Sequence, residues 1–160
     1  MKIDIINRID CAPDEISRLK EYLQKTQVNW VVKCIDNGAR VSKGEIQGLS
    51  ALGNLKTFWS DLGDVSSIKE HGSEKFSVNQ VMDALSKPQN MDNANAKKAL
   101  SKINEYSRRL ASGQLELIIT LIETNNGLMI IDGNSRAVTY FEHYKEIEES
   151  GCLPVFIIAY

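Results

Sequence analysis

Apolar residues recur at helical spacing in residues 13–25 and 42–62, which places them on one face of an α-helix. The segment of residues 42–62 has three internal glycines and begins with a Ser-x-x-Glu pattern that fits a capping box. Two further segments carry helix boundary signals. Residues 77–87 end before Pro88, and residues 90–113 have Asn and Asp caps, basic residues late in the segment and Gly113 as a stop. These signals together predict four helices, and the second of them is long.

Short runs rich in β-branched residues predict four strands. They span residues 28–35, 115–123, 128–132 and 153–158. Asn-Gly between the second and third runs predicts a tight hairpin, and the proline that begins the last run is tolerated if that strand lies near a sheet edge. The sequence thus predicts an α/β (α+β) fold, a small mixed β-sheet with packed helices.

The segment after Asp132 is compatible with two structures. Asp-Gly-Asn fits a hairpin turn, and the valine, tyrosine and phenylalanine that follow favour a strand. The apolar residues nevertheless stand at helical intervals. They are Ala137, Tyr140, Phe141, Tyr144 and Ile147. We therefore expect a helix over residues 136–149, ended by Gly151.

A strand that ends at Asp132 before a helix creates a turn that can bind an anion. The first helical turn has unpaired backbone N–H groups and the positive end of the helix dipole. Gly133 would let a ligand approach the backbone, Ser135 can donate a hydroxyl hydrogen bond, and the guanidinium of Arg136 matches phosphate oxygens. Asp132 can hold a metal ion or cap the helix. A turn glycine, a cap and a surface charge are the ordinary alternatives.

Length, composition and charge narrow the classes of function. A chain of 160 residues with 42% hydrophobic and 25% charged residues suits one globular domain. A net charge of −2 gives no broad attraction to DNA, although a local basic patch could still contact it. No run has membrane-spanning length, so no membrane partner is expected. Three scattered cysteines, Cys11, Cys34 and Cys152, fit reduced thiols of a cytoplasmic protein better than a zinc site.

The C-terminal segment resembles the ParB/sulfiredoxin superfamily. Residues 115–158 contain an apolar strand, the sequence IIDGNSRA, an aromatic helix, a glycine and then LPVFII. That family shows a strand, an Asp-Gly-x-x-Arg or Gly-x-x-Arg motif that opens a helix, and a later strand. A looser similarity covers residues 34–55, in which Arg40 would lie on a loop.

The resemblance also implies how the domain is organised. Residues 1–160 would form a single domain. Residues 28–58 and 114–160 would form the family core, and residues 60–113 a helical insertion that offers a surface to a protein partner.

In this family the motif contacts nucleotide phosphates. The resemblance therefore implies a nucleoside di- or triphosphate with Mg²⁺ as the ligand. It implies phosphate contacts for these residues: Gly133, Asn134, Ser135, Arg136 and Arg40. Asp132 would act as the metal ligand and the catalytic residue, as implied by the free-serine kinases of the family.

The resemblance leaves two classes of function open. Asn134 occupies the position of the reactive cysteine of sulfiredoxins, so reduction of sulfinic acids is not expected. Asn134 and Ser135 also replace the Glu-Arg of chromosome-partitioning members and the two histidines of the kinases. One hypothesis is phosphoryl transfer or nucleotide hydrolysis, which depends mainly on positioning and charge. The other is a non-enzymatic module that binds a protein or a nucleic acid.

Overall fold

The computed structural model describes residues 3–59, 62, 75–114, 118–144 and 152–159. In chain order the elements are β1 (Ile5–Asp10), α1 (Pro13–Gln24), α2 (Trp30–Asp36), β2 (Arg40–Gln47), α3 (Leu49–Asn54), α4 (Val78–Leu85), the 3-10 helix η1 (Pro88–Asp92), α5 (Ala94–Ala111), β3 (Thr120–Thr124), β4 (Gly127–Asp132), α6 (Asn134–Tyr144) and β5 (Cys152–Ala159). Within the described part of the chain, none of the helices is long and apolar enough to cross a membrane.

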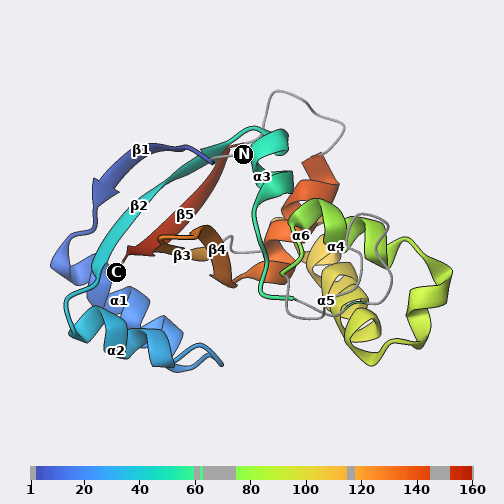
Figure 1. Ribbon diagram of the computed structural model, residues 1–160, viewed down its shortest axis with the longest axis horizontal. Coiled ribbons are helices and arrows are strands. Elements are labelled where there is room, and N and C mark those ends of the chain that lie inside the picture. Colours follow the sequence, from blue (N-terminus) through green and yellow to red (C-terminus); the bar gives the residue numbers. More distant parts are fainter. Residues whose placement is uncertain (1–2, 60–61, 63–74, 115–117, 145–151, 160) are drawn as a thin grey trace.

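A mixed five-stranded sheet organises the fold, as the sequence predicts. The strand order is β1-β2-β5-β3-β4. Neighbouring strands are antiparallel except β3 and β5, which are parallel. The last strand of the chain therefore lies inside the sheet, between two strands that are distant from each other in sequence (Figure 1). Helices pack on the sheet, which confirms the predicted mixed α and β class.

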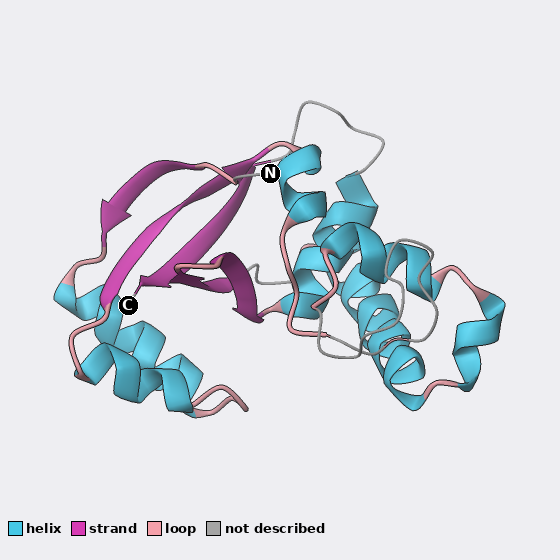
Figure 2. Ribbon diagram, in the orientation of Figure 1, coloured by secondary structure: helices cyan, strands magenta, loops and turns pink. Residues whose placement is uncertain are grey.

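Each face of the sheet buries its own hydrophobic cluster. On one face, Leu23 of α1 and Val31 of α2 belong to a cluster with Ile158 of β5. On the other, Ile103 of α5 belongs to a cluster with Ile130 of β4. Figure 2 shows α1 and α2 along one side of the sheet and the other helices gathered at one end of it. The described helices of the segment expected to be an insertion thus share a core with the strands.

The prediction of a strand over residues 28–35 is wrong, because most of this segment forms α2. The helix buries Val31, Val32 and Ile35 against α1 and the sheet. Trp30, which the apolar pattern suggests for the core, is 42% exposed. A short apolar run fits a buried strand or a buried helix equally well. Packing, rather than the β-propensity of valine and isoleucine, decides between them in this segment.

The long helix predicted over residues 42–62 is also wrong. Its first part is strand β2, and only the short helix α3 follows. Ser42 and Glu45 form no capping box, since both lie in β2. The buried Ser42 hydroxyl instead accepts a hydrogen bond from Nε of Arg8, at 3.0 Å.

Two glycines in that segment explain why it forms a strand and then turns. Gly44 lies so close to β1 that a Cβ at this position would collide with the side chain of Ile5. Gly48 has φ of +90°, a value that L side chains rarely adopt, and it leads from β2 into α3. The glycines that would weaken a helix are therefore required by the strand pairing and the turn.

Strand β1 has no counterpart among the predicted strands. It pairs with β2 at one edge of the sheet, and its register shifts between Ile6 and Ile9. Asn7, inside this irregularity, has φ of +53°. Because the shift interrupts the two-residue alternation of side chains, the sequence pattern of β1 does not resemble that of a regular strand.

The remaining elements confirm the sequence predictions. α1, α4 and α5 occupy three of the predicted helical segments, and β3 and β4 form the expected hairpin. Ser77 and Gln80 exchange capping bonds at the start of α4, and Asn93 caps α5. The predicted last part of α6, with Ile147, lies outside the described residues, as do residues 115–117 of the third predicted run.

Pro154 lies in an interior strand, although an edge position was expected. Phe156 donates its backbone N–H to Ile119 of the neighbouring chain segment, at 2.9 Å. Because backbone groups alternate along a strand, the nitrogen of Pro154, two residues earlier, faces the same neighbouring strand as the N–H of Phe156. The pairing between β3 and β5 begins at Thr120 and Phe156. Pro154 lies before the first paired residue of β5. The missing N–H therefore interrupts no hydrogen bond of the described β3 ladder.

Candidate functional site

The Asp-Gly-Asn-Ser-Arg segment joins strand β4 directly to helix α6. β4 ends at Asp132, and Gly133 has φ of +89°. α6 begins at Asn134, and the N–H of Ala137 donates to the carbonyl of Gly133 at 2.9 Å. The structure thus has the strand, turn and helix expected from the apolar spacing, and no hairpin at this position.

Gly133 is required by the packing of the protein itself. A Cβ on this residue would lie 2.8 Å from the carbonyl oxygen of Ile118 and 3.1 Å from Cγ1 of Ile119. The turn therefore packs against the chain that leads into β3. The space that a side chain would occupy is filled by the protein, so a ligand cannot approach Gly133 from that direction as the sequence suggests.

Arg136, in the first turn of α6, has an anion of the protein beside it. Its Nη2 donates to Asp132 Oδ2 at 2.9 Å and to the hydroxyl of Tyr22 at 2.8 Å. The side chains of Arg136 and Asp132 are only 13% and 16% exposed. Asp132 thus offsets the unfavourable position of a cation near the positive end of the helix dipole.

The protonation equilibria of this cluster reflect its partial burial. Burial acts to lower the pKa of Arg136, but the interactions with Tyr22 and Asp132 outweigh burial and raise it. Burial, followed by the charge of Asp132, raises the pKa of Tyr22. Arg136 therefore stays charged and Tyr22 stays a neutral hydroxyl at physiological pH.

Asn134 connects the turn to the segment after α3. Its Oδ1 accepts a hydrogen bond from the N–H of Phe58 at 2.8 Å. Nζ of Lys75 donates to the carbonyl of Phe58 at 3.0 Å and lies 4.5 Å from the centre of its ring. Nζ of Lys56 in turn donates to the carbonyl of Lys75 at 3.3 Å. Two lysines are thereby held in a chain of contacts that ends at α6.

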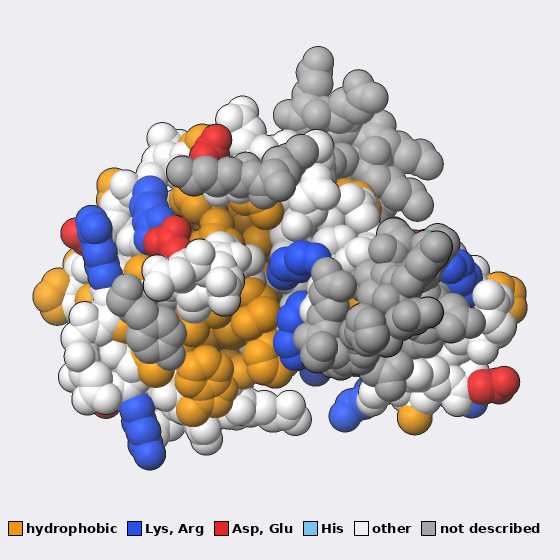
Figure 3. Space-filling view, viewed as in Figure 1, with side chains coloured by type: hydrophobic (Ala, Val, Ile, Leu, Met, Phe, Trp, Pro, Cys, Tyr) orange, Lys and Arg blue, Asp and Glu red, His pale blue; other side chains and the backbone are white. Residues whose placement is uncertain are grey.

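Basic residues of α5 surround a tyrosine that acts on Arg136. Tyr106 of α5 is near enough to Arg136 to contribute to its raised pKa. Around the ring of Tyr106 lie Arg109, at 5.5 Å, and Lys102, at 5.9 Å. Figure 3 shows lysine and arginine side chains gathered where the sheet meets the group of helices. The start of α6 is therefore a locally basic region in a chain whose net charge is −2.

Two hydroxyl residues complete the surroundings of the turn. Ser135 is buried in the first turn of α6, and its carbonyl accepts a hydrogen bond from Thr139 at 2.7 Å. Thr120 of β3 is fully buried opposite Asp132. Among the described residues, the hydroxyl of Thr120 has no hydrogen-bond partner. An unsatisfied buried hydroxyl costs free energy that a polar ligand atom or a water would recover.

Arg40 lies apart from the turn. Arg40 is the first residue of β2 and pairs with Ala159 of β5. Ala159 in turn pairs with Glu123 of β3, which lies at the end of the β3–β4 hairpin that is far from Asp132. Nε of Arg40 donates to Asp10 at 2.7 Å, and this bond lowers the pKa of Asp10. The structure therefore does not bring Arg40 together with the other residues expected to contact phosphate.

The described residues contain no group of three histidine, cysteine, aspartate or glutamate side chains that could hold a metal ion. Asp132, expected to be the metal ligand and catalytic residue, is engaged with Arg136. Its metal-binding and catalytic roles stay predictions from the resemblance.

Sequence reasoning missed the partners that reach the turn from distant segments. Tyr22 is 114 residues from Arg136, and Phe58 is 76 residues from Asn134. Tyr22 lies next to the apolar positions of α1 in the sequence, and this position predicts a side chain that is at most half-buried. No local pattern indicates which distant residue such a side chain contacts.

The cysteines lie outside this cluster, and we expect none to act chemically. Burial raises the pKa of the Cys11 thiol, and desolvation with Glu45 raises that of Cys152. Because the thiolate is the nucleophile, a raised pKa lowers reactivity at neutral pH. Iodoacetamide should alkylate Cys152 more slowly than free cysteine at pH 7, and the rate should rise with pH. Rapid alkylation at pH 7, measured by mass spectrometry, would contradict this expectation.

Comparisons with known proteins leave the family open. No family model matches the chain, and neither the curated proteins nor the solved structures contain a match. The similarity to the ParB/sulfiredoxin superfamily therefore stays a prediction from the sequence motif.

Proposed function

We propose that the chain binds a phosphate-bearing ligand, a nucleoside di- or triphosphate, at the start of α6. The observation that carries the proposal is the state of Arg136. Both of its described hydrogen bonds come from Nη2, and within the described residues Nη1 and Nε have no acceptor. A guanidinium has five N–H donors, so this side chain is held in place and keeps donors for a ligand.

The surroundings of Arg136 support an anionic ligand. The first-turn amides of α6 and the helix dipole favour negative charge. Lys75, joined to the turn through Phe58, and Arg109, beside Tyr106, add positive charge nearby. A phosphate group would meet a preorganised arginine instead of a mobile one, which reduces the entropy lost on binding.

The proposed function is binding, without a catalytic step. Asp132 is paired with Arg136, so a catalytic carboxylate would first have to exchange the arginine for a metal ion. Magnesium would arrive with the nucleotide, whose phosphates are its usual ligands.

The test is a calorimetric titration of the chain with nucleoside di- and triphosphates, with and without Mg²⁺. Hydrogen bonds to charged groups contribute roughly 1.5–3 kcal/mol. Arg136→Ala should therefore weaken binding on the order of tenfold to a hundredfold. Arg136→Lys should recover only part of the affinity, because a point charge cannot replace the planar fork of arginine.

Arg40→Ala is the matched control, since Arg40 carries the same charge but lies with Asp10. Its affinity for the nucleotide should equal that of the wild type. Circular dichroism at the titration temperature verifies that each variant is folded. Absence of binding by every nucleotide, or equal affinities for wild type and a folded Arg136→Ala, would refute nucleotide binding at the start of α6.

A further inference from the structure

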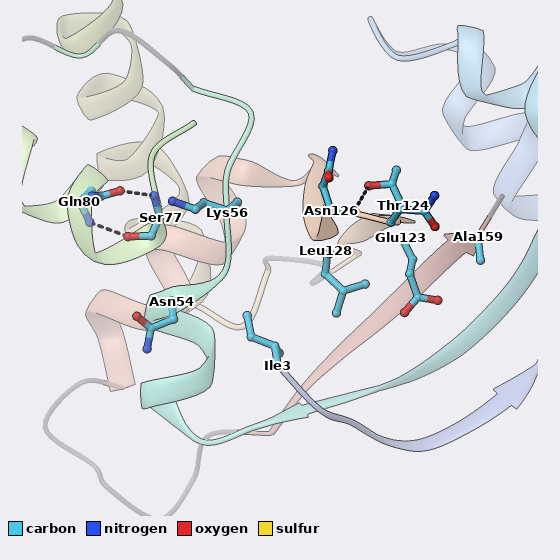
Figure 4. Close-up of a pocket in the computed structure, with 12 residues that line it drawn as sticks. Ile3, Asn54, Lys56, Ser77, Gln80, Glu123, Thr124, Asn126, Leu128 and Ala159 are labelled. Atoms are coloured by element: carbon cyan, nitrogen blue, oxygen red, sulfur yellow. Dashed lines mark hydrogen bonds between the residues drawn. The ribbon is translucent and has the colours of Figure 1, made fainter. Parts of the chain in front are cut away.

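A cavity lies away from the turn, at the tip of the β3–β4 hairpin. Its volume is about 920 Å³, which is within the range of ligand pockets. Figure 4 shows Lys56, Ser77 and Gln80 on one side and Thr124, Asn126 and Leu128 on the other. Ile3 and Leu128 contribute apolar surface to the cavity. The cavity therefore separates the hairpin from the ends of α3 and α4.

The lining of this cavity fits an uncharged polar ligand. Amides and hydroxyls dominate it, from Asn54, Ser77, Gln80, Thr124, Asn125 and Asn126. Its charged side chains are Lys56 and Glu123, and two bonds of 2.8 and 3.1 Å join Glu123 to Arg8. In the described part of the chain no aromatic side chain lines the cavity, so a nucleobase would find no stacking surface. The lining is thus unlike that of the basic region around α6.

The backbone of β4 adds a directional element to one wall. Thr124 and Gly127 close the hairpin, so alternate residues of β4 turn their backbone groups away from β3. Ile130 shows this direction, because its N–H donates to the carbonyl of Lys56 at 2.9 Å. By the same alternation the N–H of Leu128 points outward, beside the cavity. The pairing with the Lys56 segment ends at this point, where the cavity begins.

The opposite edge of the sheet is built differently. In β1 the register shift and the positive φ of Asn7 interrupt the edge. Such irregularities protect edge strands from pairing with another chain. β4 has regular pairing with β3 from Leu121 to Thr124, so the section next to the cavity keeps the geometry of a strand that can accept a partner.

We infer that this cavity binds a short, uncharged peptide segment in extended conformation. A carbonyl of the peptide accepts the N–H of Leu128, in the manner of strand addition to a sheet edge. Asparagine and glutamine side chains pair with its other amides, since each amide carries both donors and an acceptor. Leu128 and Ile3 contact its apolar side chains. Nucleotide binding at α6 is a separate property, and neither site depends on the other.

The experiment selects binders from a phage-displayed library of random heptapeptides without charged residues. The best sequence is synthesised together with a version that is N-methylated along its backbone. In NMR spectra of the full chain, the unmodified peptide should shift the Leu128 amide signal and slow its hydrogen exchange at least tenfold. The methylated peptide should bind at least tenfold more weakly, because it can neither donate nor adopt the strand geometry.

Two variants fill the cavity, and a third controls for the added tryptophan. Asn54→Trp and Thr124→Trp replace exposed lining residues and should each weaken peptide binding at least tenfold. Asn104→Trp, on the exposed surface of α5, should bind as the wild type does. The inference fails if the library yields no binder, if either filled variant binds normally in its folded state, or if Leu128 is unaffected. Added nucleotide should not displace the peptide.

Discussion

Arg136→Ala should lower the free energy of unfolding by about 1–3 kcal/mol, even without a ligand. The substitution leaves the Asp132 carboxylate, which is 16% exposed, and the Tyr22 hydroxyl without their shared donor. Breaking a fully buried ion pair costs about 3–5 kcal/mol, and the residual exposure of this pair reduces that value. In a chain of this length each kcal/mol should lower Tm by about 2–4 °C. Thermal unfolding monitored by circular dichroism measures the effect.

The double variant Asp132→Ala/Arg136→Ala distinguishes the ion pair from lost packing. If the cost of Arg136→Ala arises from the uncompensated carboxylate, removing Asp132 as well should recover part of the stability. Arg40→Ala breaks a pair whose side chains are 70% and 61% exposed, so its Tm should change much less. A wild-type Tm for Arg136→Ala would show that the pair contributes nothing and that Arg136 is free to serve a ligand alone.

Arg136 thus pairs with Asp132 inside the protein, and ligand binding is a second, proposed role. From the sequence, a cation in the first turn of a helix suggests an anionic ligand, because the dipole disfavours it. The structure supplies an anion from the preceding strand instead, since Asp132 is four residues from Arg136. The dipole alone therefore no longer indicates a ligand. The proposal of a ligand depends instead on the unused donors of the guanidinium and the basic residues nearby.

The parts of the fold that the sequence predicted are those with strong local signals. The helix after Gly133 follows from five apolar residues at helical spacing, and α5 from its cap residues. The segments predicted incorrectly have ambiguous local signals. The apolar run of residues 28–35 fits a buried strand or a buried helix. The glycines of residues 42–62 are compatible with a weak helix, and only the position of β1 shows that Gly44 is needed for strand pairing.

The same limit applies to the candidate site. The motif Asp132 to Arg136 is visible in the sequence because its residues are adjacent. The roles of Tyr22 and Lys75 are not visible in the sequence, because only the sheet order and the packing of the helices bring these residues toward the turn. Arg40 illustrates the reverse case, since a plausible loop arginine proves to lie at the other end of the sheet. Local patterns identify the chemistry of a site, and tertiary contacts decide which residues share it.

Gly133→Ala should destabilise the fold more than Arg136→Ala does. At φ of +89° an alanine incurs the cost of left-handed backbone, roughly 1–2 kcal/mol. Its Cβ would also lie 2.8 Å from the carbonyl oxygen of Ile118, a backbone atom that cannot rotate away. Overpacking of this kind adds about 1–3 kcal/mol, for a total of roughly 2–5 kcal/mol. Urea unfolding of the variant and the wild type measures the difference.

Gly113→Ala is the control that isolates the contact with Ile118. Gly113 also has positive φ, +72°, but a Cβ there would meet nothing within 4 Å. Both alanines restrict the unfolded chain equally, so this contribution cancels in the comparison. Gly113→Ala should lose only the backbone cost of about 1–2 kcal/mol. If the two variants are equally destabilised, the turn does not pack against Ile118. If Gly133→Ala loses more, the glycine of the motif is explained by the contact between the turn and the segment entering β3, whether or not a nucleotide binds.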